Sequence, residues 1–181
     1  MKPKNRVFIA TSIDGFIADQ DGKIDWLHDI PSAEGEDMGY AQFMAASDAL
    51  VMGRNTFETV LGFDIPWPYE KPVFVLSNNL KTVPEQLQDR VQIVSGPLEE
   101  VLAGIHQQGY QQLYIDGGKC IQSFLAADLI DEMILTTIPV LLGSGIPLFG
   151  ELEQKLKFDC RESKVYFDSV EQRHFVRKRE I

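Results

Sequence analysis

Three segments of the chain combine a short apolar run with residue types that suit the binding of a phosphate group. The first is Leu50-Val51-Met52-Gly53-Arg54-Asn55-Thr56. Glycine allows a ligand to approach the backbone closely, and a helix that begins here presents free N–H groups and a partial positive charge. Arg54 adds a forked guanidinium, which matches phosphate oxygens. The alternative is that Gly53 forms a tight turn and that Arg54 is a solvated surface residue.

The second segment ends in two glycines and a lysine, Leu113-Tyr114-Ile115-Asp116-Gly117-Gly118-Lys119. A strand followed by two glycines and the start of a helix can bind a pyrophosphate on backbone amides. The segment differs from the GxGxxG dinucleotide fingerprint, and Cys120 after Lys119 excludes the P-loop pattern. The alternative is that both glycines only let the helix pack closely.

The third segment, Phe74-Val75-Leu76-Ser77-Asn78-Asn79, ends in three hydrogen-bonding side chains. Taken alone, it is a strand that leaves the sheet through a turn. Ligands of parallel α/β sheets bind at the carboxyl ends of the strands. Arg54, Ser77 and the pair Gly117-Gly118 together therefore predict one phosphate-binding edge.

These segments need a sheet to hold them, and the chain alternates β-branched apolar runs with stretches of helical period. We expect strands at residues 7–11, 49–52, 72–77, 91–95 and 112–116, with helices at 36–47, 53–61, 98–107 and 117–127 and a short turn or helix at 84–87. Such alternation predicts parallel strands joined by right-handed crossovers, with helices on both faces of the sheet.

The end of the chain has a different pattern. We expect strands without intervening helices at residues 132–139, 157–160, 164–167 and 173–177, the last two forming a hairpin. The predicted fold class is α/β: a three-layer fold with a mostly parallel mixed sheet and antiparallel C-terminal strands. The length of 181 residues and the lack of a linker indicate a single domain, 1–181.

The formal charge of −10 argues against binding of nucleic acid or of anionic membranes, because a polyanion repels both. No apolar run is long enough for a signal peptide or a membrane span. Cys120 and Cys160 are too few for a disulfide framework or a zinc site, and the three histidines are widely separated. We therefore expect a cytoplasmic protein without a bound metal, whose partner is a small molecule.

The motifs resemble the dihydrofolate reductase superfamily when they are taken in order. They are Ile9-Ala10, Met52-Gly53-Arg54-x-Thr56, Leu76-Ser77 and Ile115-Asp116-Gly117-Gly118. Two further motifs, Ser12-Ile13-Asp14-Gly15 and Pro139-Val140-Leu141-Leu142-Gly143-Ser144-Gly145, are similar to the reductase domain of bacterial riboflavin biosynthesis and its stand-alone relatives. The resemblance covers residues 6–177.

The resemblance implies NADPH as the cofactor. The contacts of the family carry over to Ala10, Ile17, Gly53, Arg54, Thr56, Ser77, Asn78, Gly117, Gly118 and Lys119. It places Ala10 at the nicotinamide carboxamide and Ile17 near the ring. It places Ser77, with Arg54 and Asn78, beside the adenosine 2′-phosphate, and the remaining residues at the other phosphates.

The resemblance also implies the catalytic residues Asp37 and Thr136. Dihydrofolate reductases use a buried acid on the first helix, which matches Asp37, and a hydroxyl near it, which matches Thr136. A carboxyl group in a partly apolar cleft would have a raised pKa, which suits proton delivery. The alternative for Asp37 is a charge at a helix N-terminus, where the helix dipole favours it.

Asp14 and Trp26 are the candidate substrate contacts. The alternatives are that Asp14 forms an Asp-Gly turn and that Trp26 covers the core. The chain departs from dihydrofolate reductases, since it lacks the aromatic pair beside the acid and carries the long segment 139–149. It departs from the riboflavin enzymes, since it has no deaminase domain and no recognisable ribose-phosphate site.

The expected function is NADPH-dependent reduction of a small heterocyclic substrate, similar to a pterin or a pyrimidine. Two alternatives remain open: 5-amino-6-(5-phosphoribosylamino)uracil reductase of riboflavin biosynthesis, and an inactive nucleotide-binding protein of the same fold. We also expect a homodimer through the apolar residues of the late segment, unless these only close the core; they are Ile138, Val140, Leu141, Leu142, Ile146, Leu148 and Phe149.

Overall fold

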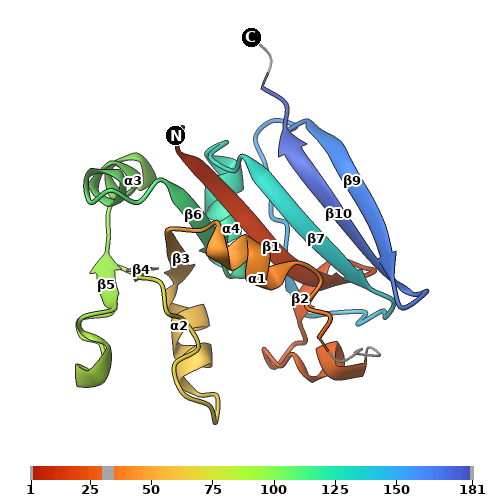
Figure 1. Ribbon diagram of the computed structural model, residues 1–181, viewed down its shortest axis with the longest axis horizontal. Coiled ribbons are helices and arrows are strands. Elements are labelled where there is room, and N and C mark those ends of the chain that lie inside the picture. The colour runs from red at the N-terminus through yellow and green to blue at the C-terminus, as the bar shows by residue number, and fades with distance from the viewer. Residues whose placement is uncertain (1, 30–34, 180–181) are drawn as a thin grey trace.

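A central sheet of eight strands organises the molecule, in the order β5-β4-β3-β6-β1-β7-β10-β9 (Figure 1). The structure is a computed structural model that describes residues 2–29 and 35–179. The strands are β1 Lys4–Ser12, β3 Ala49–Gly53, β4 Val73–Leu76, β5 Val91–Val94, β6 Gln112–Asp116, β7 Glu132–Ile138, β9 Phe158–Tyr166 and β10 Val170–Arg177. Among the described strands of this sheet, β10 pairs antiparallel with both β7 and β9 and all other pairs are parallel, which confirms the predicted mixed topology.

Helices cover both faces of the parallel part of the sheet. They are α1 Tyr40–Ala45, α2 Arg54–Leu61, α3 Leu98–Gln107 and α4 Gly118–Ala126, with the 3-10 helices η1 Asp25–Asp29 and η2 Glu85–Leu87. Strand β3 is buried on both faces: Val51 packs in the cluster that includes α3 and α4, while Leu50 and Met52 pack in the cluster that includes α1 and α2. The continuous apolar runs that predicted the strands arise from this two-sided burial.

The first helix is shorter than the predicted residues 36–47. Met38 and Gly39 have φ values of 53° and 87°, so the chain before Tyr40 has a left-handed conformation and cannot be helical. The strand predicted as 157–160 and 164–167 is one continuous strand, β9. Its exposed polar middle is held by pairing with β10, which continues to Arg177 with one register shift.

A small second sheet, which the sequence did not predict, lies beside the carboxyl ends of the central strands. It pairs β2 (Phe16–Ala18) with β8 (Ile146–Pro147). Gly145 is required here, because a Cβ atom at this position would lie 2.2 Å from the carbonyl oxygen of Ala18. The amide of Leu148 donates to the carbonyl of Gly15 at 2.9 Å and fixes the same pair of segments.

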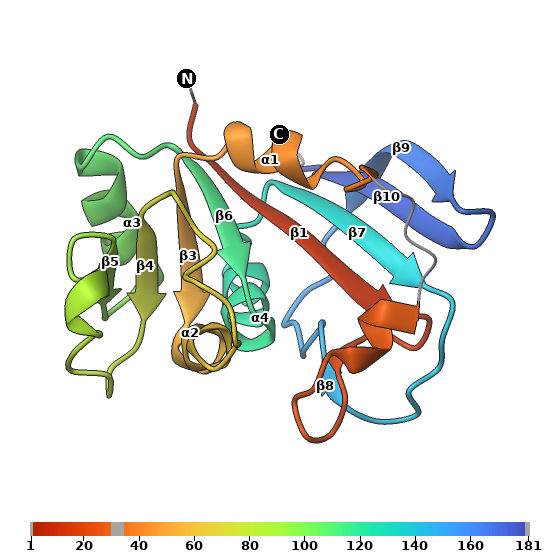
Figure 2. The same ribbon diagram turned by 60° about the horizontal axis from the view of Figure 1, so that its bottom comes forward.

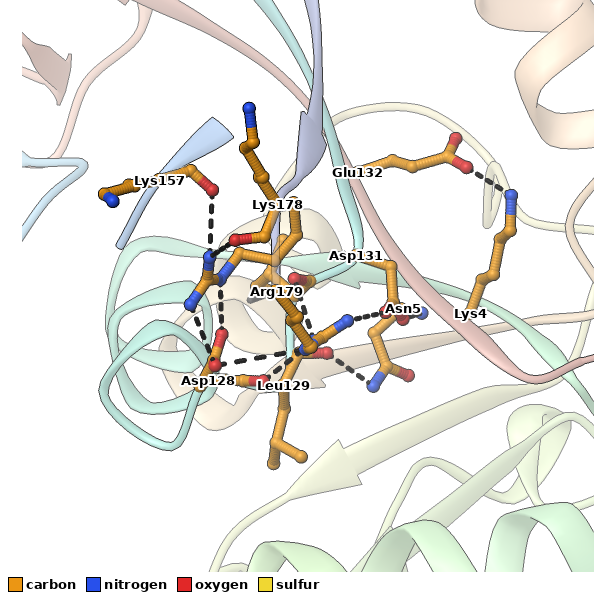
Figure 3. A network of polar contacts seen from close by, with 11 residues as sticks. Lys4, Asn5, Asp128, Leu129, Asp131, Glu132, Lys157, Lys178 and Arg179 are labelled. Atoms are coloured by element: carbon orange, nitrogen blue, oxygen red, sulfur yellow. Dashed lines mark hydrogen bonds and ion pairs between the residues drawn. The ribbon is translucent and has the colours of Figure 1, made fainter. Parts of the chain in front are cut away.

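A polar network ties residues 177–179, at and after the end of β10, to the turn between α4 and β7 (Figure 3). Arg177 donates two hydrogen bonds to the carboxylate of Asp128, at 2.6 and 3.0 Å, and its side chain is only 9% exposed. Arg179 donates to Asp131, whose other oxygen accepts the backbone N–H of Asn5. Asp128 has a φ of 53°, so this network fixes an unusual backbone at the end of α4.

In the parts of the chain that the structure describes, no helix has the length and apolar character to cross a membrane.

Candidate functional site

A cavity of about 850 Å³ lies at the carboxyl edge of the sheet. Figure 2 shows α2 and α4 at the carboxyl ends of β3 and β6, the two strands that they follow. Residues of β1, β2, β3, β4, β6, β8, α1, α2, α4 and η1, with the loops beside them, form the wall. The strand ends predicted to meet therefore do so, except that β4 contributes through Leu76 alone.

One end of the cavity has the features of a phosphate site. The first residues of α2 and of α4 line it, so two helix N-termini with their unpaired N–H groups face the same space. At Gly53, a Cβ atom would meet nothing within 4 Å, which leaves the backbone open to a ligand. Arg54 and Lys119 supply positive charge. These groups fit the pyrophosphate of a dinucleotide.

Two glycines bring α4 close to its neighbours. Gly117 has a φ of 90°, and a Cβ atom there would lie 2.2 Å from the Thr56 hydroxyl oxygen. At Gly118 a Cβ atom would lie 2.9 Å from the Ile17 side chain. The glycines therefore allow the close packing that the alternative described, and they also line the cavity, while pyrophosphate binding on their amides stays a prediction.

The predicted cofactor residues divide into two groups. Those that line the cavity are Ala10, Ile17, Gly53, Arg54, Thr56, Gly117, Gly118 and Lys119. Ser77 and Asn78 follow the lining residue Leu76 but do not line the cavity. The Ser77 hydroxyl accepts the backbone N–H groups of Asn79 and Leu80, at 3.2 and 3.0 Å, and Asn78 is exposed.

The cavity also contains a carboxyl group that the sequence analysis did not select. Asp116 ends β6 and lines the cavity; its surface is partly accessible, but the surrounding protein raises its pKa to about 6 through desolvation. The backbone N–H of Gly117 donates to it at 2.8 Å. The sequence does contain a signal that could have identified Asp116: it is a single acid at the end of an apolar strand, directly before two glycines.

Aromatic side chains surround this acid. Phe8, Tyr40, Tyr69 and Tyr114 all line the cavity. Burial raises the pKa of each tyrosine, and the negative charge of Asp116 raises it further. The Tyr114 hydroxyl donates to the carbonyl of Phe8 at 3.0 Å. The cavity therefore joins a phosphate-binding end to an aromatic pocket that contains one acid.

The structure places Asp37 outside the cavity lining, and the raised pKa predicted for it is wrong. Its side chain is exposed and accepts the backbone N–H groups of Ala41 and Gly39, at 2.7 and 2.9 Å. These hydrogen bonds stabilise the carboxylate and lower its pKa. The alternative, a charge at the start of a helix, describes this position.

Thr136 is buried at the core, one strand away from the cavity. It pairs in register with the lining residue Ala10, and its hydroxyl accepts a hydrogen bond from Gln172 at 3.0 Å. The same Gln172 nitrogen donates to the carbonyl of Met38 at 3.0 Å. Thr136 thus supports the segment before α1 through Gln172.

The two candidate substrate contacts also lie outside the cavity lining. Asp14 accepts hydrogen bonds from the Ser12 hydroxyl and from the amides of Leu142 and Gly143, which lowers its pKa and fixes the loop after β7. Trp26 is buried in a cluster with Ile138 and Val170. Its neighbour Leu27 reaches the cavity instead.

Comparison with known proteins places this geometry in a family. The model of the RibD C-terminal domain matches residues 3–170. A solved structure described as a putative riboflavin biosynthesis protein from Shewanella sp. PV-4 is 53% identical in sequence, with a TM-score of 0.94. The match covers 97% of this chain and 99% of that chain.

Two more distant structures share the fold. One is the diaminohydroxyphosphoribosylaminopyrimidine deaminase/5-amino-6-(5-phosphoribosylamino)uracil reductase of Thermotoga maritima, with 15% identity and a TM-score of 0.73 over 98% of this chain and 57% of that chain. The other is the dihydrofolate reductase of Enterococcus faecalis in complex with NADP(H), with 18% identity and a TM-score of 0.64 over 97% of each chain.

Proposed function

Because the chain belongs to the RibD C-terminal domain family, we propose that it is an NADPH-dependent reductase of a small heterocyclic substrate, similar to a pterin or a pyrimidine. One observation carries the proposal: a single cavity is lined by two helix N-termini, two cations, several aromatic side chains and one desolvated, partly accessible acid. The complex of a protein of the same fold with NADP(H) supports the choice of cofactor.

The phosphate end of the cavity would hold the cofactor. When bound, NADPH supplies the hydride. The amides at the starts of α2 and α4, with Arg54 and Lys119, would bind its phosphates. Ala10 and Ile17 would position the nicotinamide. Ser77 and Asn78, just beyond the lining at Leu76, remain our proposed contacts for the 2′-phosphate.

Asp116 would supply the proton. It lines the cavity, and its pKa of about 6 leaves part of the population protonated near neutral pH. Asp37 has neither property, since it is exposed and its pKa is lowered. We therefore assign the general acid to Asp116, and Thr136 to the support of the segment before α1 through Gln172.

Titration of the purified protein with NADPH and NADH tests the cofactor assignment. We expect saturable NADPH binding that Arg54→Ala weakens, and a preference for NADPH over NADH that Ser77→Ala reduces. Arg161→Ala is the matched control, because this exposed cation lies on β9 and does not line the cavity. Absence of saturable NADPH binding would refute the proposal.

Family membership and the Thermotoga maritima enzyme favour a second candidate, 5-amino-6-(5-phosphoribosylamino)uracil reductase. Complementation of a riboflavin auxotroph that lacks this reductase tests it, beside a direct assay with dihydrofolate. Growth without dihydrofolate turnover would favour the pyrimidine reductase. Tight NADPH binding without oxidation across pterins, flavins and pyrimidines would favour an inactive nucleotide-binding protein.

A further inference from the structure

We infer that the substrate of this site is an uncharged planar aromatic ring that carries no phosphate group. The inference rests on the proposed function and concerns the part of the cavity that a bound cofactor would leave open. It separates this chain from a reductase of 5-amino-6-(5-phosphoribosylamino)uracil, whose substrate carries a phosphate.

The first argument is the number of cations. Among the described residues that line the cavity, Arg54 and Lys119 are the only Lys or Arg side chains. Both lie in the first turns of α2 and α4, where the cofactor phosphates would bind. The pyrophosphate and 2′-phosphate of NADPH together carry more charge than two cations neutralise. Residues 30–34, outside the described part, contain no Lys or Arg in the sequence.

The second argument is the character of the remaining wall. Its aromatic lining residues are Phe8, Tyr40, Phe63, Tyr69 and Tyr114. Flat aromatic ligands stack on such side chains or pack against their edges. The polar groups are the Asp116 carboxyl and the tyrosine hydroxyls, which suit the nitrogen and oxygen atoms at the edge of a heterocycle.

The third argument is electrostatic. Tyr69 and Tyr114 already have raised pKa values, to which the negative charge of Asp116 contributes after burial. The same field opposes a second anion in this pocket. A phosphate placed here without a cation would lose its hydration and gain no ion pair, which is strongly unfavourable.

The described loop after α2 adds no cation to its side of the rim; the exposed Lys23, between the lining residues Gly22 and Ile24, belongs to the segment after β2. The loop after α2 runs Leu61-Gly62-Phe63-Asp64-Ile65-Pro66, in which Leu61, Phe63 and Ile65 are 38%, 39% and 58% exposed. Its one charged residue is Asp64. A phosphate that extended out of the pocket past Phe63 would therefore meet an apolar and acidic surface.

Calorimetric titration of the protein saturated with NADP⁺ tests the inference. The probes are two matched pairs: 5-amino-6-(5-phosphoribosylamino)uracil with its dephosphorylated form, and dihydroneopterin phosphate with dihydroneopterin. We expect at least one neutral probe to bind, about tenfold or more tightly than its phosphate. Equal or tighter binding of the phosphates, or failure of both neutral probes, overturns the inference. Failure of NADP⁺ to bind overturns the proposed function, and the inference with it.

A charge introduced at the rim gives a second test. Phe63→Arg should tighten binding of the phosphorylated probes about tenfold relative to Phe63→Leu, which removes the ring without adding charge. The two variants should bind the neutral probes alike. If Phe63→Arg and Phe63→Leu bind the phosphorylated probes equally, the lack of a cation is not what excludes phosphate, and the inference is wrong.

Discussion

At the scale of single residues, two aspartates show how position changes one side chain. Asp37 is exposed and accepts two backbone N–H groups, so its pKa is lowered. Asp116 lies in the cavity wall and accepts one backbone N–H group, that of Gly117. Desolvation raises its pKa to about 6. Only the second can hold a proton near neutral pH. The sequence resemblance pointed to Asp37, because matching by alignment cannot detect which carboxyl group is desolvated.

We expect Asp116→Asn to lower kcat at least about 100-fold, because the variant cannot donate the proton. NADPH binding, followed by titration, should be preserved. In the parent protein kcat/KM should fall as the pH rises through about 6, since the acid must be protonated, and the variant should lose this dependence. Asp37→Asn is the control and should keep nearly full turnover. Loss of turnover in Asp37→Asn with retention in Asp116→Asn would reverse the assignment.

The same carboxyl group should affect stability. Its folded-state pKa of about 6 lies above the ordinary value of 3.8, so the stability it contributes is fully present below about pH 4 and is lost as the pH rises through about 6. The loss amounts to at most about 3 kcal/mol. The amide that replaces the carboxyl group in Asp116→Asn does not titrate. Urea unfolding should therefore show this variant gaining stability relative to the parent between pH 4 and pH 8; a constant difference would contradict this.

At the scale of elements, the ends of β3 and β6 differ in what their glycines do. Gly117→Ala should destabilise the fold by about 2 kcal/mol or more, because the residue has a positive φ and the added Cβ would meet Thr56. Gly53→Ala should leave the unfolding free energy nearly unchanged and weaken NADPH binding about tenfold, because its Cβ enters the open cavity. Denaturant unfolding and cofactor titration on both variants check this; an unaltered affinity in Gly53→Ala would contradict it.

The connection after α4 depends on the end of β10. Arg177→Ala should lower the unfolding free energy by about 2–3 kcal/mol, because it leaves the partly buried Asp128 without its two-hydrogen-bond partner. Arg161→Ala is the control: its ion pair with Asp159 is 4.0 Å long and exposed, and its loss should change little. Thermal unfolding of the two variants measures the difference, and equal effects would show that burial of the Arg177 pair is unimportant.

Elements with a full period of apolar residues were predictable, and short or locally strained ones were not. The helix Leu98–Gln107 and the strand Gln112–Asp116 agree with the expected bounds, because burial fixes their periodicity. The sheet of β2 and β8 has too few residues to show a period. The start of α1 depends on the left-handed backbone of Met38, a residue type that rarely adopts it. The sequence motifs at the starts of α2 and α4 identified residues that line the cavity, whereas the desolvation of Asp116 depends on burial that only the fold creates.

At the scale of the whole molecule, the late apolar segment still favours a homodimer. Ile138 and Leu148 are buried in the core, but Leu141, Ile146 and Phe149 are 71%, 39% and 49% exposed. Exposed apolar side chains so close in sequence favour association with a second copy.

We expect light scattering at micromolar concentration to give twice the chain mass of 20.4 kDa. The double variant Leu141→Asp/Phe149→Asp should give the mass of one chain, while Ile65→Asp at the rim of the cavity should leave the dimer intact. A parent protein that already has the mass of one chain would refute the prediction.

The position of β1 has a consequence for synthesis of the chain. Of the described strands β1 is synthesised before the others, yet it lies in the middle of the sheet, where Lys4 pairs with Gln112 and Arg6 pairs with Glu132. During translation, β3, β4 and β5 can pair with one another before the partner strands of β1, which are β6 and β7, have been synthesised. Its apolar residues, among them the fully buried Val7, stay exposed until β6 and β7 emerge. A ribosome that stalls before β7 therefore holds a nascent chain with an unpaired central strand, which is a binding site for chaperones and a starting point for aggregation.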